Sequence, residues 1–248
     1  MATLVTFHAH PDDECILTGG VMRKAFEEGH RVVLVVATRG EAGLVPDFLE
    51  PGEDLPRRRV AETHASAELL GAARVEFLGY RDSGMMGDDL NDAPGSFWTA
   101  DAEEAARRLA AILTEENADV LTIYDSFGGY GHPDHIQVHR VGRRAAEIAG
   151  TSKVYQAMAR RSEIIEAHRR AGMEVPDVFD DGVPESEINV GVDVRKYLDV
   201  KRKAMRAHAS QITEDSFFLS LDEETFALAF GTEWFIGDGE GPSDALAL

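Results

Sequence analysis

Five of the nine histidines in this 248-residue chain fall in two short windows whose residue types could bind a metal ion. The first window, 7–14, reads FHAHPDDE, and the second, 128–139, reads GGYGHPDHIQVH. Two imidazoles and one carboxylate, with one position left for water, form a common catalytic zinc site. The two windows can supply this set from His10, Asp13 and His135.

The remaining polar residues of the windows suggest the other parts of a hydrolytic site. Zinc would lower the pKa of a coordinated water to about 7. Asp12, next to the predicted ligand Asp13, is placed to take the proton of that water. We expect His132, as a cation, to stabilise a tetrahedral oxyanion and to protonate a leaving amine. Asp134 is expected to orient His132.

Other residues in or near the windows favour structural interpretations. His8 is expected to pack at the end of a strand. The spacing from His135 to His139 resembles H-E-x-x-H, but Ile136 stands where the glutamate base would be, so His139 is expected to be only a polar residue on a helix face. Cys15 is the single cysteine, so no thiolate set exists and the metal ligands must be histidine and aspartate.

The hydrophobic pattern predicts alternating strands and helices that bring the two windows to one edge of a sheet. Strands are expected at 3–7, 31–38, 74–80, 119–125 and 153–159, and helices at 16–28, 57–70, 101–117 and 134–149. This order predicts an α/β fold of the Rossmann-like, three-layer kind, with a mostly parallel sheet flanked by helices. Ligands of such sheets bind beyond the carboxyl ends of the strands, which is where both windows fall.

The alternation breaks near residue 160, which predicts a single domain with a C-terminal addition. The core is expected over 1–160, a cap that helps to shape the substrate pocket over 161–236, and a loose tail over 237–248. Within the cap the sequence predicts elements in the following order: a helix at 160–171, a Pro/Asp-rich stretch at 173–186, a strand at 187–194, a helix at 195–209 and an apolar segment at 216–236.

The composition of the chain indicates which kinds of binding partner are not expected for this protein. The chain has 25 Lys and Arg against 45 Asp and Glu, a formal charge of −20, which argues against nucleic acid and anionic lipid as partners. No signal peptide or membrane-spanning run is evident, and one cysteine fits a reducing compartment, so a cytoplasmic location is expected. No G-x-G-x-x-G or G-x-x-x-x-G-K-[ST] motif follows any predicted strand, which removes the main support for nucleotide binding.

The paired motifs resemble those of a known enzyme family. HAHPDDE at 8–14 and GHPDH at 131–135 are similar to the motifs of the LmbE / PIG-L family of zinc-dependent N-acetylglucosaminyl deacetylases. Segments 77–85, 125–131 and 203–212 resemble its mycothiol branch in particular, which comprises the biosynthetic deacetylase and the mycothiol S-conjugate amidase.

The resemblance implies roles that agree with those inferred from the residues. It implies that the zinc ligands are His10, Asp13 and His135, that Asp12 is the general base, and that His132 is the electrophilic or general-acid histidine. It adds Tyr130, which would help to polarise the substrate carbonyl. It also adds Arg59 and Asp82, which would bind the hydroxyls or the second ring of the substrate, although a helix start and a turn are the structural alternatives for these two residues.

The sequence therefore predicts metal-dependent hydrolysis of an N-acyl amide, most simply N-acetyl, on a small amino-sugar-like substrate. The ion is expected to be Zn²⁺, although Fe²⁺ or another divalent ion is also possible. The chain could also form a homo-oligomer. One alternative is an amidase or deacetylase of a thiol conjugate or a glycosylated natural product. For the amidase, segment 13–19 lacks the lysine that its branch carries. The non-enzyme alternative is a carbohydrate-binding protein on a dead scaffold, which the complete set of site residues argues against.

Overall fold

A seven-stranded sheet runs through the computed structural model, which describes residues 1–175, 183–238 and 243–248. The strands, in the spatial order β3-β2-β1-β4-β5-β7-β6, are β1 (Thr3–His8), β2 (Arg31–Val36), β3 (Arg74–Phe77), β4 (Val120–Tyr124), β5 (Lys153–Met158), β7 (Thr232–Gly237) and β6 (Val190–Asp193). The first five strands pair in parallel, as predicted, whereas β7 runs antiparallel to both β5 and β6. The predicted α/β class is confirmed.

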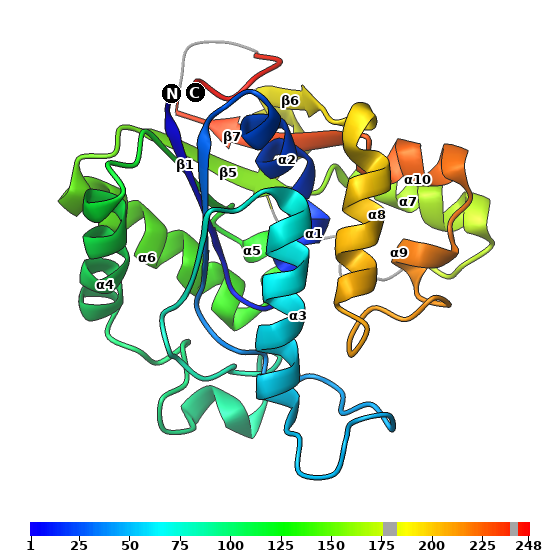
Figure 1. Cartoon of the computed structure of the whole chain (residues 1–248), viewed down its shortest axis with the longest axis horizontal. Helices are drawn as coiled ribbons and strands as arrows, with labels where there is room; N and C mark the ends of the chain where they lie inside the picture. Colours follow the sequence, from blue (N-terminus) through cyan, green and yellow to red (C-terminus); the bar gives the residue numbers. More distant parts are fainter. Residues whose placement is uncertain (176–182, 239–242) are drawn as a thin grey trace.

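Helices cover both faces of the sheet and bury an apolar core on each (Figure 1). One face carries α4 (Ala102–Glu115) and α6 (Pro133–Ala149). The other carries α1 (Asp13–Leu17), α2 (Gly19–Glu27), α3 (Leu55–Leu70), α7 (Arg161–Ala171), α8 (Leu198–Ala207), α9 (Phe217–Ser220) and α10 (Glu223–Phe230). Short 3₁₀ turns occupy Asp89–Asp92, Glu185–Glu187 and Arg195–Tyr197. Burial on both faces explains why β2 and β4 are almost wholly apolar.

The single helix predicted over 16–28 is wrong, because the chain forms α1 and α2 with a break at Thr18. The N-terminus of α2 has no cap from its own N-cap side chain. Instead the Glu233 carboxylate, from β7, accepts the backbone N–H groups of Gly20 at 2.7 Å and Val21 at 2.8 Å. Glu233 is paired in turn with the buried Lys201 of α8 at 2.5 Å. A local sequence pattern cannot predict a helix cap whose side chain lies 213 positions away in the chain.

The C-terminal part is more closely joined to the sheet than the sequence suggested. The apolar segment 216–236 contains β7, which pairs directly with β5, so that part of the predicted cap belongs to the sheet. The predicted loose tail is wrong for residues 243–248, because Ser243 donates its backbone N–H to Asn189 at 2.7 Å and Leu246 is buried. The rest of the predicted tail and of the Pro/Asp-rich stretch, 239–242 and 176–182, lies outside the described residues.

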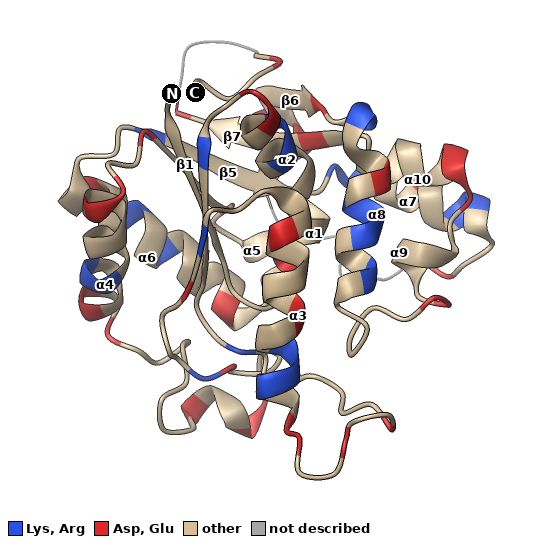
Figure 2. Ribbon diagram, viewed as in Figure 1, with Lys and Arg blue, Asp and Glu red and all other residues tan. Residues whose placement is uncertain are grey.

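Charged residues are spread over the helices and loops (Figure 2). Many of the acids form ion pairs there with arginine on the same or a neighbouring helix, such as Glu103 with Arg107 and Arg144. Among the described residues, no helix is both long and apolar enough to cross a bilayer.

Candidate metal and active site

The two histidine windows meet where the strand order reverses. β1 lies between β2 and β4, so the loops that leave β1 and β4 open on the two sides of one crevice at the carboxyl edge of the sheet. The first window forms the loop after β1 and the start of α1. The second forms the short helix α5 (Gly128–Gly131) after β4 and the start of α6, with His132 as its N-cap and Pro133 at its first position.

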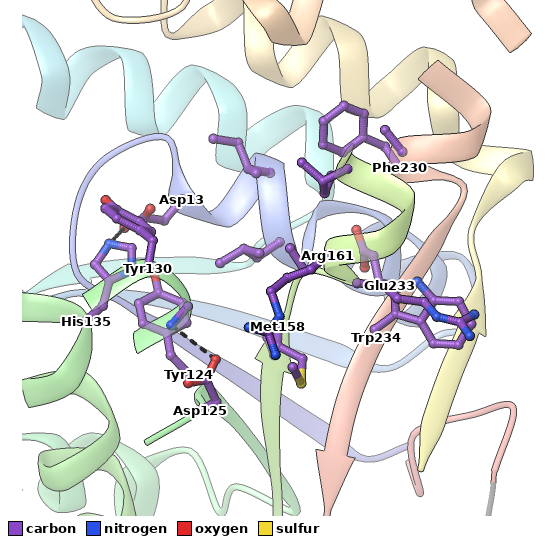
Figure 3. Close-up of a pocket in the computed structure, with 18 of the residues that line it drawn as sticks. Asp13, Tyr124, Asp125, Tyr130, His135, Met158, Arg161, Phe230, Glu233 and Trp234 are labelled. Carbon is purple, nitrogen blue, oxygen red and sulfur yellow. Dashed lines mark hydrogen bonds and ion pairs between the residues drawn. The ribbon is translucent and has the colours of Figure 1, made fainter. Parts of the chain in front are cut away.

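The Asp13 carboxylate lies close to the imidazoles of both His10 and His135 in this crevice. Oδ2 of Asp13 lies 3.5 Å from Nδ1 of His10 and 3.5 Å from Nε2 of His135, and Figure 3 shows Asp13 and His135 facing each other. Around a tetrahedral ion with bonds of about 2.0–2.1 Å, neighbouring ligand atoms lie about 3.3–3.4 Å apart. Nε2 of His135 is also buried without a hydrogen-bond partner. The spacing and this unpaired nitrogen fit a divalent cation held by His10, Asp13 and His135.

The electrostatics of the crevice also suit a cation. Burial alone would lower the pKa of His10, but the carboxylates of Asp82, Asp13 and Asp134 outweigh burial and raise that pKa well above its usual value. Three carboxylates around one imidazole are a local excess of negative charge in a buried site. A divalent cation balances that charge.

Asp134 contacts both histidines, because its carboxylate lies against His10 while only its backbone N–H reaches His132, the partner predicted for its side chain. One oxygen of its carboxylate lies 3.1 Å from Nε2 of His10 and accepts the backbone N–H of Ser83 at 2.9 Å, and the other accepts the hydroxyl of Ser83. The Asp134 side chain, at the second position of α6, therefore points across the crevice to the loop after β3. It does not point back to the N-cap residue His132. Because His10 donates Nε2–H to Asp134, its Nδ1 presents a lone pair toward Asp13 and the metal position.

Replacing Asp134 with asparagine should weaken metal binding by about 10- to 100-fold, because a neutral amide replaces the charged acceptor that fixes the tautomer of His10 and raises its basicity. Competition with a metal-sensitive chelator dye measures the affinity. Gln137→Ala, which removes a buried side chain one turn further along α6, is the control and should leave the affinity unchanged. An Asp134→Asn protein that binds metal as tightly as the parent would contradict this role.

His132 is a neutral hydrogen-bond donor in this structure, not the predicted cation. Its Nδ1 accepts the backbone N–H of Asp134 at 3.1 Å, which leaves the proton on Nε2. Burial, together with the neighbouring His10 and His135, lowers the pKa of His132 to about 3. Its ring centroid lies 4.6 Å from that of His10 and 5.1 Å from that of His135. A neutral imidazole at this position can donate a hydrogen bond to a developing oxyanion.

Asp12 stands beside the metal position in an unusual backbone conformation. Its φ of 100° is in the region that residues other than glycine avoid. Its carboxylate contacts Arg59 at 3.3 Å and makes no hydrogen bond to the predicted metal ligands. Burial raises the pKa of Asp12 to about 6, against the opposing effect of Arg59. A carboxylate with a pKa near the working pH is suited to accept and return a proton.

Arg59 and Asp82, the predicted substrate-binding residues, both lie at the site and are buried. Arg59 donates to the carbonyls of Gly40 at 3.0 Å and Pro11 at 2.5 Å, and a Cβ on Gly40 would lie 2.1 Å from its guanidinium. Asp82 accepts the backbone N–H groups of Gly84 and Ala42. These contacts are to the protein itself, so substrate binding by the two residues stays a prediction.

Tyr130 faces the crevice with 38% of its surface exposed, and its ring centroid lies 5.0 Å from that of His135 (Figure 3). The turn that carries it requires glycine at position 128, where φ is 69° and a Cβ would lie 2.6 Å from the Cβ of His135. The phenol is protonated near neutral pH and can donate a hydrogen bond. This placement is compatible with the predicted contact to a substrate carbonyl.

The structural interpretations of His8 and His139 are supported. His8 lies 2.8 Å from the hydroxyl of Tyr124 and 2.8 Å from that of Thr18, and burial lowers its pKa to about 4. His139 contacts the carbonyl of Tyr124 at 3.0 Å. The sequence reasoning missed Ser83, which holds Asp134. The only signal was its position directly after Asp82 in a loop that follows a strand.

A cavity of about 490 Å³ extends from the metal position toward the C-terminal elements (Figure 3). Asp13, Tyr130 and His135 line one end of it. The other end, which we call the apolar chamber, is lined mainly by apolar side chains of α1, α7, α9, α10 and β7, which include Ile16, Ile164, Phe217, Phe218, Phe230 and Trp234. No local sequence pattern predicts this chamber, because its walls come from several elements that are far apart in the chain.

Fold and site together define a class: an α/β protein with two histidines and one carboxylate placed so that they could hold a metal ion, and a further carboxylate beside them. Residues 5–146 match the model of the family described as PIG-L: GlcNAc-PI de-N-acetylase, and the chain belongs to this family. The 1D-myo-inositol 2-acetamido-2-deoxy-alpha-D-glucopyranoside deacetylase of Acidothermus cellulolyticus is 42% identical over 94% of this chain and 88% of its own length. The predicted family is thus confirmed.

Solved structures support the same fold. The N,N'-diacetylchitobiose deacetylase from Pyrococcus horikoshii has 24% sequence identity and a TM-score of 0.62, over 95% of this chain and 83% of that one. GalB, the 4-carboxy-2-hydroxymuconate hydratase from Pseudomonas putida, has 18% identity and a TM-score of 0.63 over the whole of both chains. Because a hydratase shares the fold, the fold alone does not specify the reaction.

Proposed function

We propose that the protein is a metal-dependent hydrolase that removes the acetyl group from the amine of an amino-sugar substrate. The observation that carries the proposal is the approach of the Asp13 carboxylate to both His10 and His135, with the carboxylate of Asp12 held nearby by Arg59. Metal-dependent hydrolysis needs both a metal position and a neighbouring base. A carbohydrate-binding protein without activity would need neither of them.

The residues of the chain divide the work of the reaction. A bound divalent ion supplies Lewis-acid polarisation of the amide carbonyl and lowers the pKa of water. Asp12 takes the proton of the attacking water and returns it to the departing amine. The hydroxyl of Tyr130 and Nε2–H of His132 donate hydrogen bonds to the carbonyl oxygen as it becomes an oxyanion. Asp134 keeps His10 in the tautomer that binds the ion.

An acetate-release assay tests the proposal. The protein, loaded with Zn²⁺ or Fe²⁺, should release acetate from 1D-myo-inositol 2-acetamido-2-deoxy-α-D-glucopyranoside, and a chelator should stop the release. We expect Zn²⁺ to be the resident ion, because two imidazoles and a carboxylate are typical of catalytic zinc sites. Purified protein that binds no divalent ion would support the dead-scaffold alternative, and an active protein unaffected by metal removal would contradict the mechanism.

The apolar chamber favours a second candidate, a substrate with a large apolar group on or near the amino sugar. A sugar and inositol alone bring hydroxyls, which gain little from phenylalanine side chains such as Phe217, Phe218 and Phe230. A thiol conjugate or a glycosylated natural product would bury apolar surface there, at about 25 cal/mol per Å². The chamber thus supports the conjugate as the finer description of the substrate.

A series of glycosides separates the two candidates. If the chamber binds substrate, kcat/KM for a phenyl or octyl glycoside of N-acetylglucosamine should exceed that for the methyl glycoside by about 10-fold or more. Phe218→Ala should reduce this preference, whereas Phe48→Ala, which truncates an exposed phenylalanine outside the chamber, should not. Equal kcat/KM values across the series would exclude the conjugate in favour of the smaller, polar substrate.

We further propose that the protein works in the cytoplasm on a small molecule and without a nucleic-acid or membrane partner. The support is its charge: 45 acidic residues against 25 basic ones give a surface that repels phosphate. Only a few acids lie at the site, so most of the net charge comes from residues outside it. Size-exclusion chromatography would determine whether the chain forms a homo-oligomer.

A further inference from the structure

We propose that His208 is a positioning residue for the general base Asp12 and acts on it through the buried carboxylate of Glu14. The inference rests on the proposed function, since it concerns the base of that reaction. His208 belongs to the segment after α8, which packs against α1 and α3 (Figure 1). Nothing in the two motif windows identifies it.

Asp12 is fixed from three sides. Its backbone N–H donates to Oε2 of Glu14 at 3.0 Å, its carbonyl accepts from the thiol of Cys15 at 2.9 Å, and its carboxylate contacts Arg59. A non-glycine residue with a φ of 100° keeps that conformation only where its surroundings enforce it. The hydrogen bond to Glu14 is made by the backbone N–H of Asp12, next to the strained φ angle. It therefore helps to set the direction in which the Asp12 side chain points.

Glu14 is itself held by partners from distant elements. Its Oε1 lies 2.6 Å from Nε2 of His208 and accepts the hydroxyl of Ser66 at 2.5 Å. Glu14 and His208 are fully buried, and 194 positions separate them in the chain. One carboxylate oxygen is thus occupied by His208 and Ser66, which aims the other oxygen at Asp12. Loss of His208 frees the carboxylate to rotate away.

An unpaired atom favours positioning over simple packing. Nδ1 of His208 is buried and has no hydrogen-bond partner. An unpaired buried polar atom costs about 1–3 kcal/mol, which a leucine at this position would avoid. The neighbouring Arg59, the other side chain that holds Asp12, also has an unpaired buried nitrogen, Nε. His208 and Arg59 therefore each lower the stability of the fold by leaving a buried nitrogen unpaired. A residue with a purely structural role would not need such a nitrogen.

Two substitutions of His208 test the proposal on the metal-loaded full-length enzyme. His208→Leu removes the donor to Glu14 and should lower kcat by about 10- to 100-fold, because a displacement of about 1 Å at a reacting group has that effect. KM and metal content should stay within about 2-fold, since neither involves Asp12 orientation. His208→Gln, whose amide can still donate to Glu14, should recover most of kcat. If His208→Leu does not fold, His208→Asn, whose amide is too short to reach Glu14, replaces it.

Ser210→Ala is the matched control. Ser210 lies two residues further along the same buried segment and contacts Glu62 through its hydroxyl at 2.6 Å and its N–H at 3.0 Å, with no contact to Asp12 or Glu14. It should lower the Tm without lowering kcat. The proposal is overturned if the His208 variants turn over at the parental kcat, or if Ser210→Ala loses kcat to the same degree.

A crystal structure of the His208→Leu protein keeps this test independent of the substrate. The Asp12 carboxylate should be displaced from Arg59, and its φ should leave the positive region. Unchanged Asp12 geometry would overturn the positioning role even if the enzyme deacetylates the assayed sugar. Displaced Asp12 in an enzyme that releases no acetate would support the role and reject the proposed function instead.

Discussion

Asp12→Ala is expected to leave the metal bound and to lower kcat by about 10²- to 10⁴-fold, the range typical of a general acid–base residue. The carboxylate makes no hydrogen bond to the predicted ligands and is aimed beside them by Arg59 and by the backbone at φ 100°. Its removal therefore takes away the proton acceptor but none of the three ligand atoms. Metal content by atomic absorption and steady-state acetate release measure the two effects separately.

Asp47→Ala, which removes an exposed aspartate from the loop after β2, is the control for this substitution and should keep the parental kcat. KM should change little in the Asp12 variant, because a base acts on the transition state more than on bound substrate. If the Asp12→Ala protein releases acetate at the parental rate, Asp12 is not the base. If the protein instead loses its metal, Asp12 is a ligand and the assignment of Asp13 must be revised.

The parts of the site that the sequence predicted are those set by local chain geometry. The strands before the two windows are continuous apolar runs, and the carboxyl ends of parallel neighbours meet at one edge. These two features alone predict that His10, Asp13 and His135 lie close together, as the structure has them. The N-cap position of His132 followed from Pro133, which favours the first turn of a helix.

The parts that the sequence could not predict depend on contacts between distant segments. Asp134 was assigned to His132 because the two are neighbours in the chain, but the loop after β3 places Ser83 and His10 within reach of its carboxylate. The protonation of His132 depends on tertiary contacts in the same way, since burial and two neighbouring imidazoles lower its pKa. A local pattern contains neither burial nor the partners that other loops supply.

The C-terminal elements show this limit on a larger scale. Segment 216–236 was predicted only as apolar, because three short elements of mixed type share it and none is long enough to show a clear period. The pairing of β7 with β5 brings Glu233 to α2 and brings the phenylalanines of α9 and α10 to the cavity. The substrate preference that we propose therefore rests on the region whose local sequence pattern is least informative.

His135→Ala should abolish metal binding and turnover, whereas His132→Ala should lower turnover and keep the metal. The contrast matters because the nitrogens of His10, His132 and His135 all lie within 4.8 Å of one another, so a three-histidine site is a geometric alternative. The two sets differ in one member, Asp13 or His132. Nδ1 of His132 accepts a backbone N–H, which occupies the lone pair that a ligand would need, so the set with Asp13 is favoured.

Metal affinity measured by competition with a chelator distinguishes the two sets. The loss for His135→Ala should exceed the 10- to 100-fold loss expected when only the orientation of a ligand is disturbed, and its Tm should no longer rise when Zn²⁺ is added. His132→Ala should still show that rise in Tm, while kcat falls because one oxyanion donor is missing. The metal would be assigned to the three histidines if two results occur together: the Tm of His132→Ala does not rise with Zn²⁺, and Asp13→Ala still binds zinc tightly.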